Sequence, residues 1–182
     1  MSPDTGPRAM GESAMAVLQA KDEIRDVLMR YCRGVDRLDA DLLASCYHAD
    51  SLDDHGHWRG NGHEFATFIV GSLAQRSHHT THSVSNVLIE LAPADPEVAH
   101  AESYTTAYLR RRDEGGVEWL DLFAGRYVDR FERRAGTWRI ARRVVVHDWS
   151  VSTRLDAEMS FPLPMEGFTQ GRRDRSDIVF GA

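Results

Sequence analysis

The sequence predicts an α+β domain in which helices come first and a long antiparallel sheet follows. Two observations carry this prediction. Between residues 14 and 75, apolar side chains recur every three or four positions, which is the period of one helical face. After residue 79 the chain instead holds four long runs rich in Val, Ile, Thr, Tyr, Phe and Trp. With 182 residues, the chain is expected to form one domain whose core is large enough to fold unaided.

The helical half is expected to follow a disordered tail, because residues 1–12 are rich in Pro, Gly, Ser and Asp. A first helix is predicted from Ala14 to Val35. Its apolar residues share one face: Val17, Ile24, Leu28, Tyr31 and Val35. Asp39 is predicted to N-cap a short second helix that carries Leu42, Leu43, Cys46 and Tyr47. A third helix is predicted from about Gly62 to Gln75.

The strand half consists of residues 80–91, 98–111, 118–133 and 137–149. The connectors between these runs carry Pro and Gly and are short, which favours antiparallel pairing. A further short strand is expected around Ser51 to Trp58. Residues 13–155 are therefore expected to form the folded domain. Residues 156–182 hold Pro162, Pro164 and several Gly and Arg, and are expected to form an irregular tail that covers the pocket or an interface.

Charge, cysteine content and hydropathy exclude several classes of function and location. The formal net charge of −6 argues against general binding of nucleic acids or anionic membranes. Cys32 and Cys46 lie in helix-like segments among apolar residues, so they are expected to be reduced and buried rather than disulfide-bonded. No apolar run approaches membrane-spanning length and no leader-like apolar stretch begins the chain, so the protein is expected to be cytoplasmic.

Asp36 ends the first predicted helix at the margin of its apolar face, one turn beyond Cys32. An acid in such a place is costly unless it is paired or used. Two roles are open: Asp36 accepts backbone N–H groups at the junction of two helices, or it acts as a general base or the orienter of one. Tyr31, in the middle of the same face, is either a core residue or a hydroxyl donor to a substrate oxygen.

His82 closes the dense cluster His78, His79, Thr80, Thr81 and His82. Histidine suits proton transfer because its ordinary pKa lies near neutrality. A zinc site is the alternative, since His55 and His57 add further imidazoles. The spacing does not match a helical H-E-x-x-H site and no thiolate pair supports a structural zinc, so no metal site is predicted.

Arg143 lies in the last strand run, where Ala141, Arg143 and Val145 alternate with Ile140, Arg142 and Val144. If this strand is central, one of the two arginines points inward and needs an acidic partner or an anionic ligand. An edge strand would leave both solvated. Other polar residues are candidates for substrate binding: Asp54, His55, Asn86, Glu102, Tyr104 and His147.

Several motifs together resemble the SnoaL-like, nuclear transport factor 2-like superfamily. They are Tyr31-Cys-Arg-Gly-Val-Asp36-Arg-Leu-Asp39, Tyr47-His-Ala-Asp50 with Asp53-Asp-His-Gly56, His82-Ser-Val-Ser-Asn86, Thr137-Trp-Arg-Ile-Ala-Arg-Arg143, and Gly171-Arg-Arg-Asp-Arg-Ser-Asp177. The resemblance covers about residues 14–155, with the last motif in the tail. It implies a cone-shaped α+β barrel, in which a curved antiparallel sheet packs on three helices and encloses a cavity.

Within this superfamily the chain is similar to bile-acid 7α-dehydratase, scytalone dehydratase and γ-hexachlorocyclohexane dehydrochlorinase. The resemblance implies an Asp–His dyad formed by Asp36 and His82, with Tyr31 and Arg143 stabilising charge or assisting the leaving group. It also implies that no metal or organic cofactor takes part. By the same analogy, the protein is expected to be a homodimer or homotrimer.

The sequence therefore predicts a cofactor-independent lyase that acts on a small hydrophobic oxygenated ring compound, such as a steroid or polyketide. Because the superfamily hosts several activities, the fold does not fix the reaction. One alternative is an isomerase or cyclase that uses the same base without net elimination. Another is a non-catalytic carrier of hydrophobic ligands or an oxygenase subunit.

Overall fold

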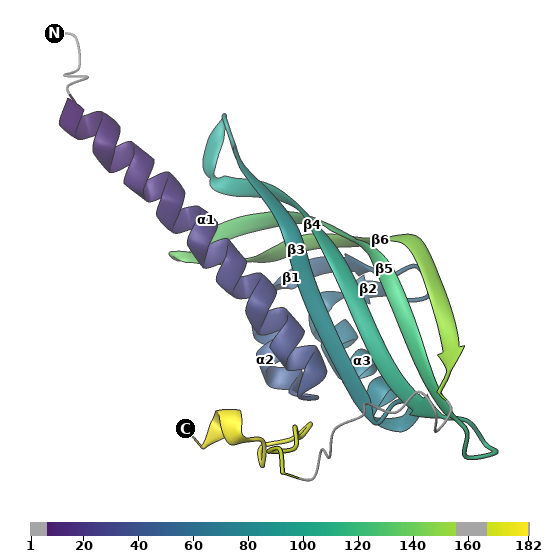
Figure 1. The fold of residues 1–182 in the computed structure, drawn as a ribbon. Coiled ribbons are helices and arrows are strands. Elements are labelled where there is room, and N and C mark those ends of the chain that lie inside the picture. Colours follow the sequence, from purple (N-terminus) through teal and green to yellow (C-terminus); the bar gives the residue numbers. More distant parts are fainter. Residues whose placement is uncertain (1–6, 156–166, 182) are drawn as a thin grey trace, which may run out of the picture.

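The computed structural model describes residues 7–155 and 167–181 of the chain (Figure 1). Three helices and six strands make up the main body. The helices are α1 (Pro7–Asp36), α2 (Ala40–Ser45) and α3 (Gly62–Arg76). The strands are β1 (Tyr47–Asp54), β2 (Arg59–Asn61), β3 (His79–Ala92), β4 (Asp95–Arg112), β5 (Glu118–Arg134) and β6 (Thr137–Arg154). The predicted α+β class and the order of its elements are confirmed.

Helix α1 begins earlier than predicted. It is helical from Pro7, so the expected disordered tail does not extend through residue 12, and residues 1–6 lie outside the described residues. Proline suits a helix start because its fixed φ is already helical and its missing N–H would have no partner there. The second helix starts as predicted: the Asp39 side chain accepts a hydrogen bond from the Leu42 amide at 3.0 Å.

A glycine lets α1 and α2 cross closely. A Cβ placed on Gly34 would lie 2.9 Å from the backbone nitrogen of Leu43 and 3.0 Å from its Cα. Backbone atoms cannot move aside as a side chain can, so any larger residue would push the two helices apart. Gly34 therefore fixes where α1 ends and, with it, the position of Asp36.

The sheet has the strand order β2-β1-β6-β5-β4-β3. Strands β3 to β6 form an antiparallel meander, as the short connectors predict. Strand β1 pairs in parallel with β6, so the sheet is mixed rather than wholly antiparallel. In Figure 1 the long strands curve around one face, which α1 crosses diagonally while α2 and α3 lie beneath. The buried core between these layers includes Ile24, Leu28, Phe65, Phe131, Trp138 and Ile140.

A register shift in β6 changes which of its residues face the core. Simple alternation along the strand predicts that Arg143 and Ile140 lie on opposite faces of the sheet. In the structure the pairing with β5 shifts between Ile140 and Arg142, and both Ile140 and Arg143 are fully buried. A β-bulge of this kind inserts an extra residue and turns the following side chains to the other face. Arg142 is exposed, so the prediction that one arginine of the pair points inward is confirmed.

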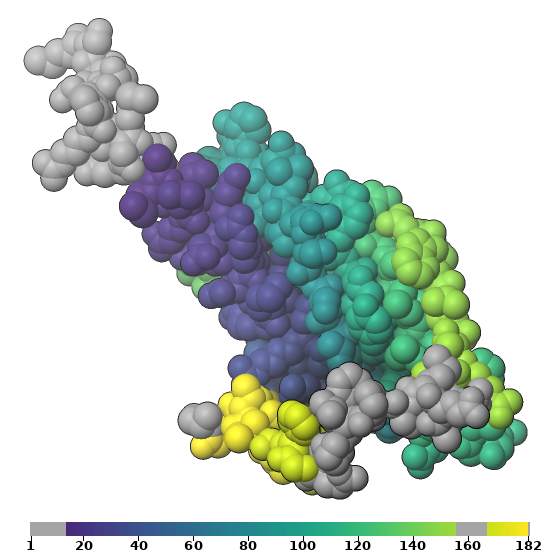
Figure 2. All heavy atoms as spheres, viewed as in Figure 1, coloured from purple at the N-terminus to yellow at the C-terminus, as the bar shows by residue number. Residues whose placement is uncertain are grey.

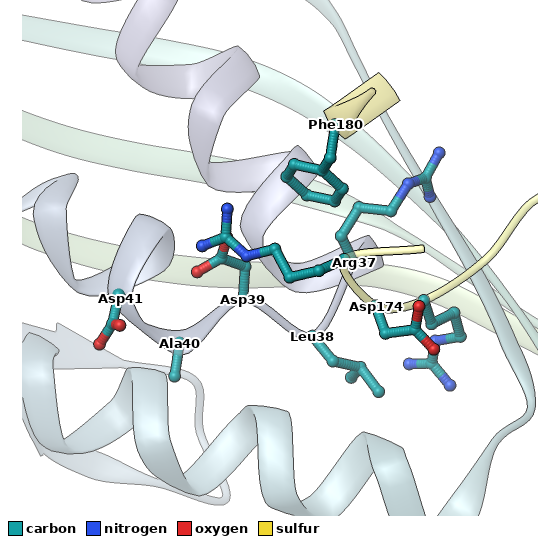
Figure 3. Close-up of a pocket in the computed structure, with 9 residues that line it drawn as sticks. Arg37, Leu38, Asp39, Ala40, Asp41, Asp174 and Phe180 are labelled. Atoms are coloured by element: carbon teal, nitrogen blue, oxygen red, sulfur yellow. The ribbon is translucent and has the colours of Figure 1, made fainter. Parts of the chain in front are cut away.

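Residues 167–181 pack over the junction of α1 and α2 (Figure 2) and end in a 3₁₀ helix, η2 (Ile178–Phe180). Ion pairs hold this segment: Arg37 with Asp177 at 3.5 Å, and Arg175 with Asp39 at 3.0 Å. A pocket of about 300 Å³ with mixed charge lies between the segment and the junction (Figure 3). Residues 156–166, the rest of the expected tail, lie outside the described residues. Among the described helices, none is long and apolar enough to cross a membrane.

Candidate active site

An apolar cavity of about 260 Å³ lies between the helices and the curved sheet. Helix α1 supplies Tyr31 and Val35, α3 supplies Phe65, Ile69 and Leu73, and the sheet supplies His82, Leu109, Tyr127 and Val145. His55 and His57, from the loop after β1, also line it. The walls are mostly hydrocarbon and aromatic, with a few polar groups among them. Such a cavity suits a small hydrophobic ligand that carries one or two oxygen atoms.

Asp36 and His82 meet at the edge of this cavity. Asp36 Oδ1 lies 2.7 Å from His82 Nδ1, and Asp36 Oδ2 accepts a hydrogen bond from the His82 backbone amide at 2.9 Å. Strand β3 is an edge strand, so this amide needs a partner outside the sheet. With the carboxylate accepting at both oxygens, His82 carries its proton on Nδ1, and Nε2 is left with a lone pair.

A second carboxylate–imidazole pair places its imidazole, His55, on the wall of the same cavity. Asp53 Oδ1 contacts His55 Nδ1, and Tyr47 donates its hydroxyl to Asp53 Oδ2 at 2.5 Å. His55 Nε2 lies 3.2 Å from the Tyr31 hydroxyl, and the His55 ring stacks on Phe65 with 4.0 Å between centroids. Burial lowers the pKa of His55, and the Asp53 carboxylate opposes that effect. His55 was predicted to bind substrate, but its partners Asp53 and Tyr31 were not foreseen.

Arg143 lies behind the cavity wall rather than on it. Its guanidinium makes a bidentate pair with Asp129, at 2.8 Å and 2.7 Å, and both side chains are fully buried. The guanidinium carbon lies 4.1 Å from the centre of the Tyr31 ring and 3.9 Å from that of Tyr127. The predicted acidic partner therefore exists. Arg143 acts on the cavity through the two tyrosines, because it is not among the residues that line it.

The buried tyrosine hydroxyls keep their protons. Burial raises the pKa of Tyr31 well above its usual value, although the nearby Arg143 opposes the shift. Burial likewise raises the pKa of Tyr127. Both phenols are therefore neutral hydrogen-bonding groups at neutral pH.

Five predicted substrate-binding residues do not line the cavity. Glu102 and Tyr104 point to the outer face of the sheet, because the inward positions of β4 are the odd-numbered Ala101, Ser103, Thr105 and Ala107. Glu102 pairs there with Arg126 at 2.8 Å. The remaining three predicted residues also lie away from the cavity. Asn86 is exposed at a bulge with φ of 48°, Asp54 pairs with Arg59, and His147 contacts Ser150.

Sequence reasoning missed Asp129 and Tyr127, although a signal was present. Tyr127, Asp129 and Phe131 alternate along β5 and share its inward face, so an acid stands between two large apolar residues. A buried arginine on the neighbouring strand was already expected, and the two could have been matched. Across the described residues, no cluster of three or more His, Cys, Asp and Glu is arranged to hold a metal ion. Cys32 and Cys46 are buried and free, as predicted.

Residues 16–144 match the SnoaL-like domain model. The chain belongs to this family. Among solved structures, LinA superposes with a TM-score of 0.69 at 23% identity, covering 84% of this chain and 99% of LinA. A proposed scytalone dehydratase from Novosphingobium aromaticivorans superposes with a TM-score of 0.68 at 18% identity, covering 79% of this chain and 94% of that one.

A third structure, a protein of unknown function from Mycobacterium tuberculosis, matches with a TM-score of 0.59 at 23% identity and covers 80% of this chain and 78% of its own. No curated protein sequence matches the chain. At these identities the likeness establishes the fold, which this SnoaL-like chain shares with dehydratases and dehydrochlorinases.

Proposed function

We propose that the protein is a lyase that removes water from a small cyclic β-hydroxyketone, with His82 as general base and Asp36 as its orienting carboxylate. The observation that carries this proposal is the double contact of Asp36 with the backbone and ring of His82 at the wall of an apolar cavity. The fold family and its dehydratase and dehydrochlorinase neighbours support the same class of reaction.

The geometry of the dyad favours proton abstraction by His82 Nε2. The backbone amide holds one oxygen of Asp36, so the other oxygen stays aimed at Nδ1. This contact fixes the tautomer and stabilises the imidazolium that forms when Nε2 takes a proton. Asp36 therefore positions both the strand that carries His82 and the imidazole ring itself.

The substrate class follows from what an imidazole can deprotonate. A carbon–hydrogen bond becomes acidic enough when a neighbouring carbonyl group accepts the electron pair, and a hydroxyl on the next carbon can then leave. Hydrocarbon walls from Phe65, Ile69 and Leu73 suit a ring skeleton, and the volume of about 260 Å³ suits one or two fused rings. Compounds of the polyketide type with one or two fused rings belong to this class.

Tyr31 is the group best placed to meet a substrate oxygen. Tyr31 lines the cavity, and its ring is held against the Arg143 guanidinium at 4.1 Å. The positive charge behind the ring favours negative charge developing in front of it. Arg143 is therefore a positioning residue in this scheme, and the earlier expectation that it meets the leaving group itself is replaced.

The test compares dyad variants with matched controls on a panel of cyclic β-hydroxyketones. One probe is a hydroxytetralone with its hydroxyl β to the carbonyl, because loss of water gives a naphthol that absorbs strongly. Asp36→Asn and His82→Ala are each expected to lower kcat/KM by about 10²- to 10⁴-fold, the usual worth of a general base. Asp41→Asn and His79→Ala are the matched controls. They change exposed residues close in sequence to Asp36 and His82 and are expected to leave the rate unchanged.

Two outcomes would contradict the proposal: turnover of the panel by His82→Ala at the wild-type rate, or no turnover by the wild-type protein. Product mass separates the reaction classes, because elimination loses water whereas isomerisation and cyclisation by the same base do not. A carrier would bind the ring compounds and return them unchanged.

A further inference from the structure

The hydrogen bonds around His55 form a continuous chain from a buried carboxylate to the cavity. Tyr47 donates to Asp53 Oδ2, Asp53 Oδ1 meets His55 Nδ1, and His55 Nε2 meets the Tyr31 hydroxyl. Asp53 is buried and the His55 side chain is only 13% exposed, so bulk water has little access to these contacts. Both His55 and Tyr31 line the same cavity as His82.

The positions of the protons follow from these contacts. A carboxylate only accepts hydrogen bonds, so His55 donates to Asp53 from Nδ1. In neutral His55 the other nitrogen, Nε2, then accepts, and Tyr31 must donate its hydroxyl proton to it. The Tyr31 proton is therefore turned away from the cavity in the neutral state. When His55 is protonated, Nε2–H donates to the Tyr31 oxygen and frees the Tyr31 proton for a substrate oxygen.

From this wiring we infer that Asp53, His55 and Tyr31 form a second proton relay, which delivers a proton to the departing hydroxyl while His82 takes the proton from carbon. This inference rests on the proposed lyase function and adds to it. The site then has two imidazoles with opposite roles: His82 accepts a proton and His55 supplies one. Each imidazole is hydrogen-bonded to its own aspartate. Tyr31 is the group in contact with the substrate, and His55 acts through it.

The relay balances atom by atom. His82 Nε2 takes the α proton, the C–H electron pair becomes the new C=C bond, and the C–O bond breaks. The departing oxygen receives the Tyr31 hydroxyl proton and leaves as water. Tyr31 recovers a proton from His55 Nε2–H, which returns the relay to the arrangement seen in the structure. One proton has then moved from His55 to His82, and exchange with solvent resets both imidazoles.

The surroundings of His55 set the pH range of the relay. Asp53 and Tyr31 contact it, Phe65 stacks on it, and Arg143 and His57 act from further away. Burial, Arg143 and His57 lower the pKa of His55, and Asp53 raises it. The supplying form is therefore lost as pH rises, and kcat/KM is expected to show a descending alkaline limb.

Nitrogen NMR of the imidazole rings tests the wiring without any substrate. The expected result is that neutral His55 carries its proton on Nδ1. In the Tyr31→Phe variant, His55 Nε2 loses its partner in both protonation states. The bond that the protonated ring donates to the Tyr31 oxygen is charge-assisted and is the stronger of the two, so the pKa of His55 is expected to fall. A neutral His55 protonated on Nε2, or a pKa unchanged in Tyr31→Phe, would overturn the relay.

The pH profile of hydroxytetralone dehydration tests the role. His55→Asn keeps an amide near Asp53 but removes the nitrogen that meets Tyr31, so it is expected to lose the alkaline limb and to lower kcat/KM by about 10²-fold or more. His55→Gln, which retains a polar group toward Tyr31, is expected to lose the limb as well. A His55→Asn enzyme that keeps both the limb and the rate, while His82→Ala is inactive, would refute the relay and leave the lyase proposal standing. Activity in His82→Ala would instead refute the lyase proposal.

Discussion

The buried Arg143–Asp129 pair predicts a large loss of stability in Arg143→Met. Both side chains are fully buried and joined by two hydrogen bonds, so the substitution leaves the Asp129 carboxylate without its cation. Breaking a buried pair in this way costs about 3–5 kcal/mol. For a chain of this size, about 2–4 °C per kcal/mol applies, so the melting temperature is expected to fall by about 6–20 °C.

The loss is also expected to depend on pH. Burial raises the pKa of the Asp129 carboxyl, and Arg143 opposes that rise, so its removal lifts the pKa further. A carboxyl whose pKa is higher in the folded state stabilises the fold below its unfolded pKa and loses that contribution as pH rises. Arg143→Met is therefore expected to be closest to wild type in acid and to diverge from it toward neutral pH.

Urea unfolding measures the effect, with Arg142→Met as the matched control. Arg142 is the adjacent arginine and is exposed, so its replacement is expected to change the free energy of unfolding by less than about 0.5 kcal/mol. The double variant Arg143→Met with Asp129→Leu is expected to recover much of the loss, because neither charge is then buried alone. A loss in Arg143→Met no larger than that in Arg142→Met would refute the reasoning.

Two further predictions concern the helices and the outer face of the sheet. Gly34→Ala places a Cβ 2.9 Å from the Leu43 backbone, so it is expected to lower the free energy of unfolding by about 1–3 kcal/mol in urea titrations; an unchanged midpoint would show that α2 gives way freely. The outer face of the sheet exposes Tyr104, Tyr108 and Val151, so light scattering is expected to show a homodimer or homotrimer that Tyr108→Glu weakens. A monomer at micromolar concentration would contradict this expectation.

The helices and the long strands could be predicted from the sequence because their signals are local. The 3.6-residue period of α1, the Asp39 cap and the alternating strands all act over a few neighbouring residues. The parallel pairing of β1 with β6 was not predictable in this way, because it joins segments about 90 residues apart. The bulge that turns Arg143 inward also leaves no local mark in the sequence.

Only part of the candidate site could be predicted from the sequence. Asp36 and His82 could be paired from motif resemblance, and the structure brings them within hydrogen-bonding distance. Glu102 and Tyr104 were candidates for substrate binding, but both lie on the outer face of the sheet. The inward face of β4 instead carries small residues, Ala101, Ser103, Thr105 and Ala107, several of them completely or nearly completely buried. Only the three-dimensional packing shows which face of β4 points toward the cavity and which points outward.

The C-terminal segment has a practical consequence for anyone who shortens this chain. Arg173 donates to the Ser77 carbonyl at 2.6 Å and contacts Thr80, two residues before His82. A protein trimmed at the end of β6 would keep every described residue that lines the cavity and would lose this brace on the strand that carries His82. An assay of such a trimmed chain would therefore test His82 without this brace, and a shortened fragment is a poor substitute for a chain that includes residues 167–181.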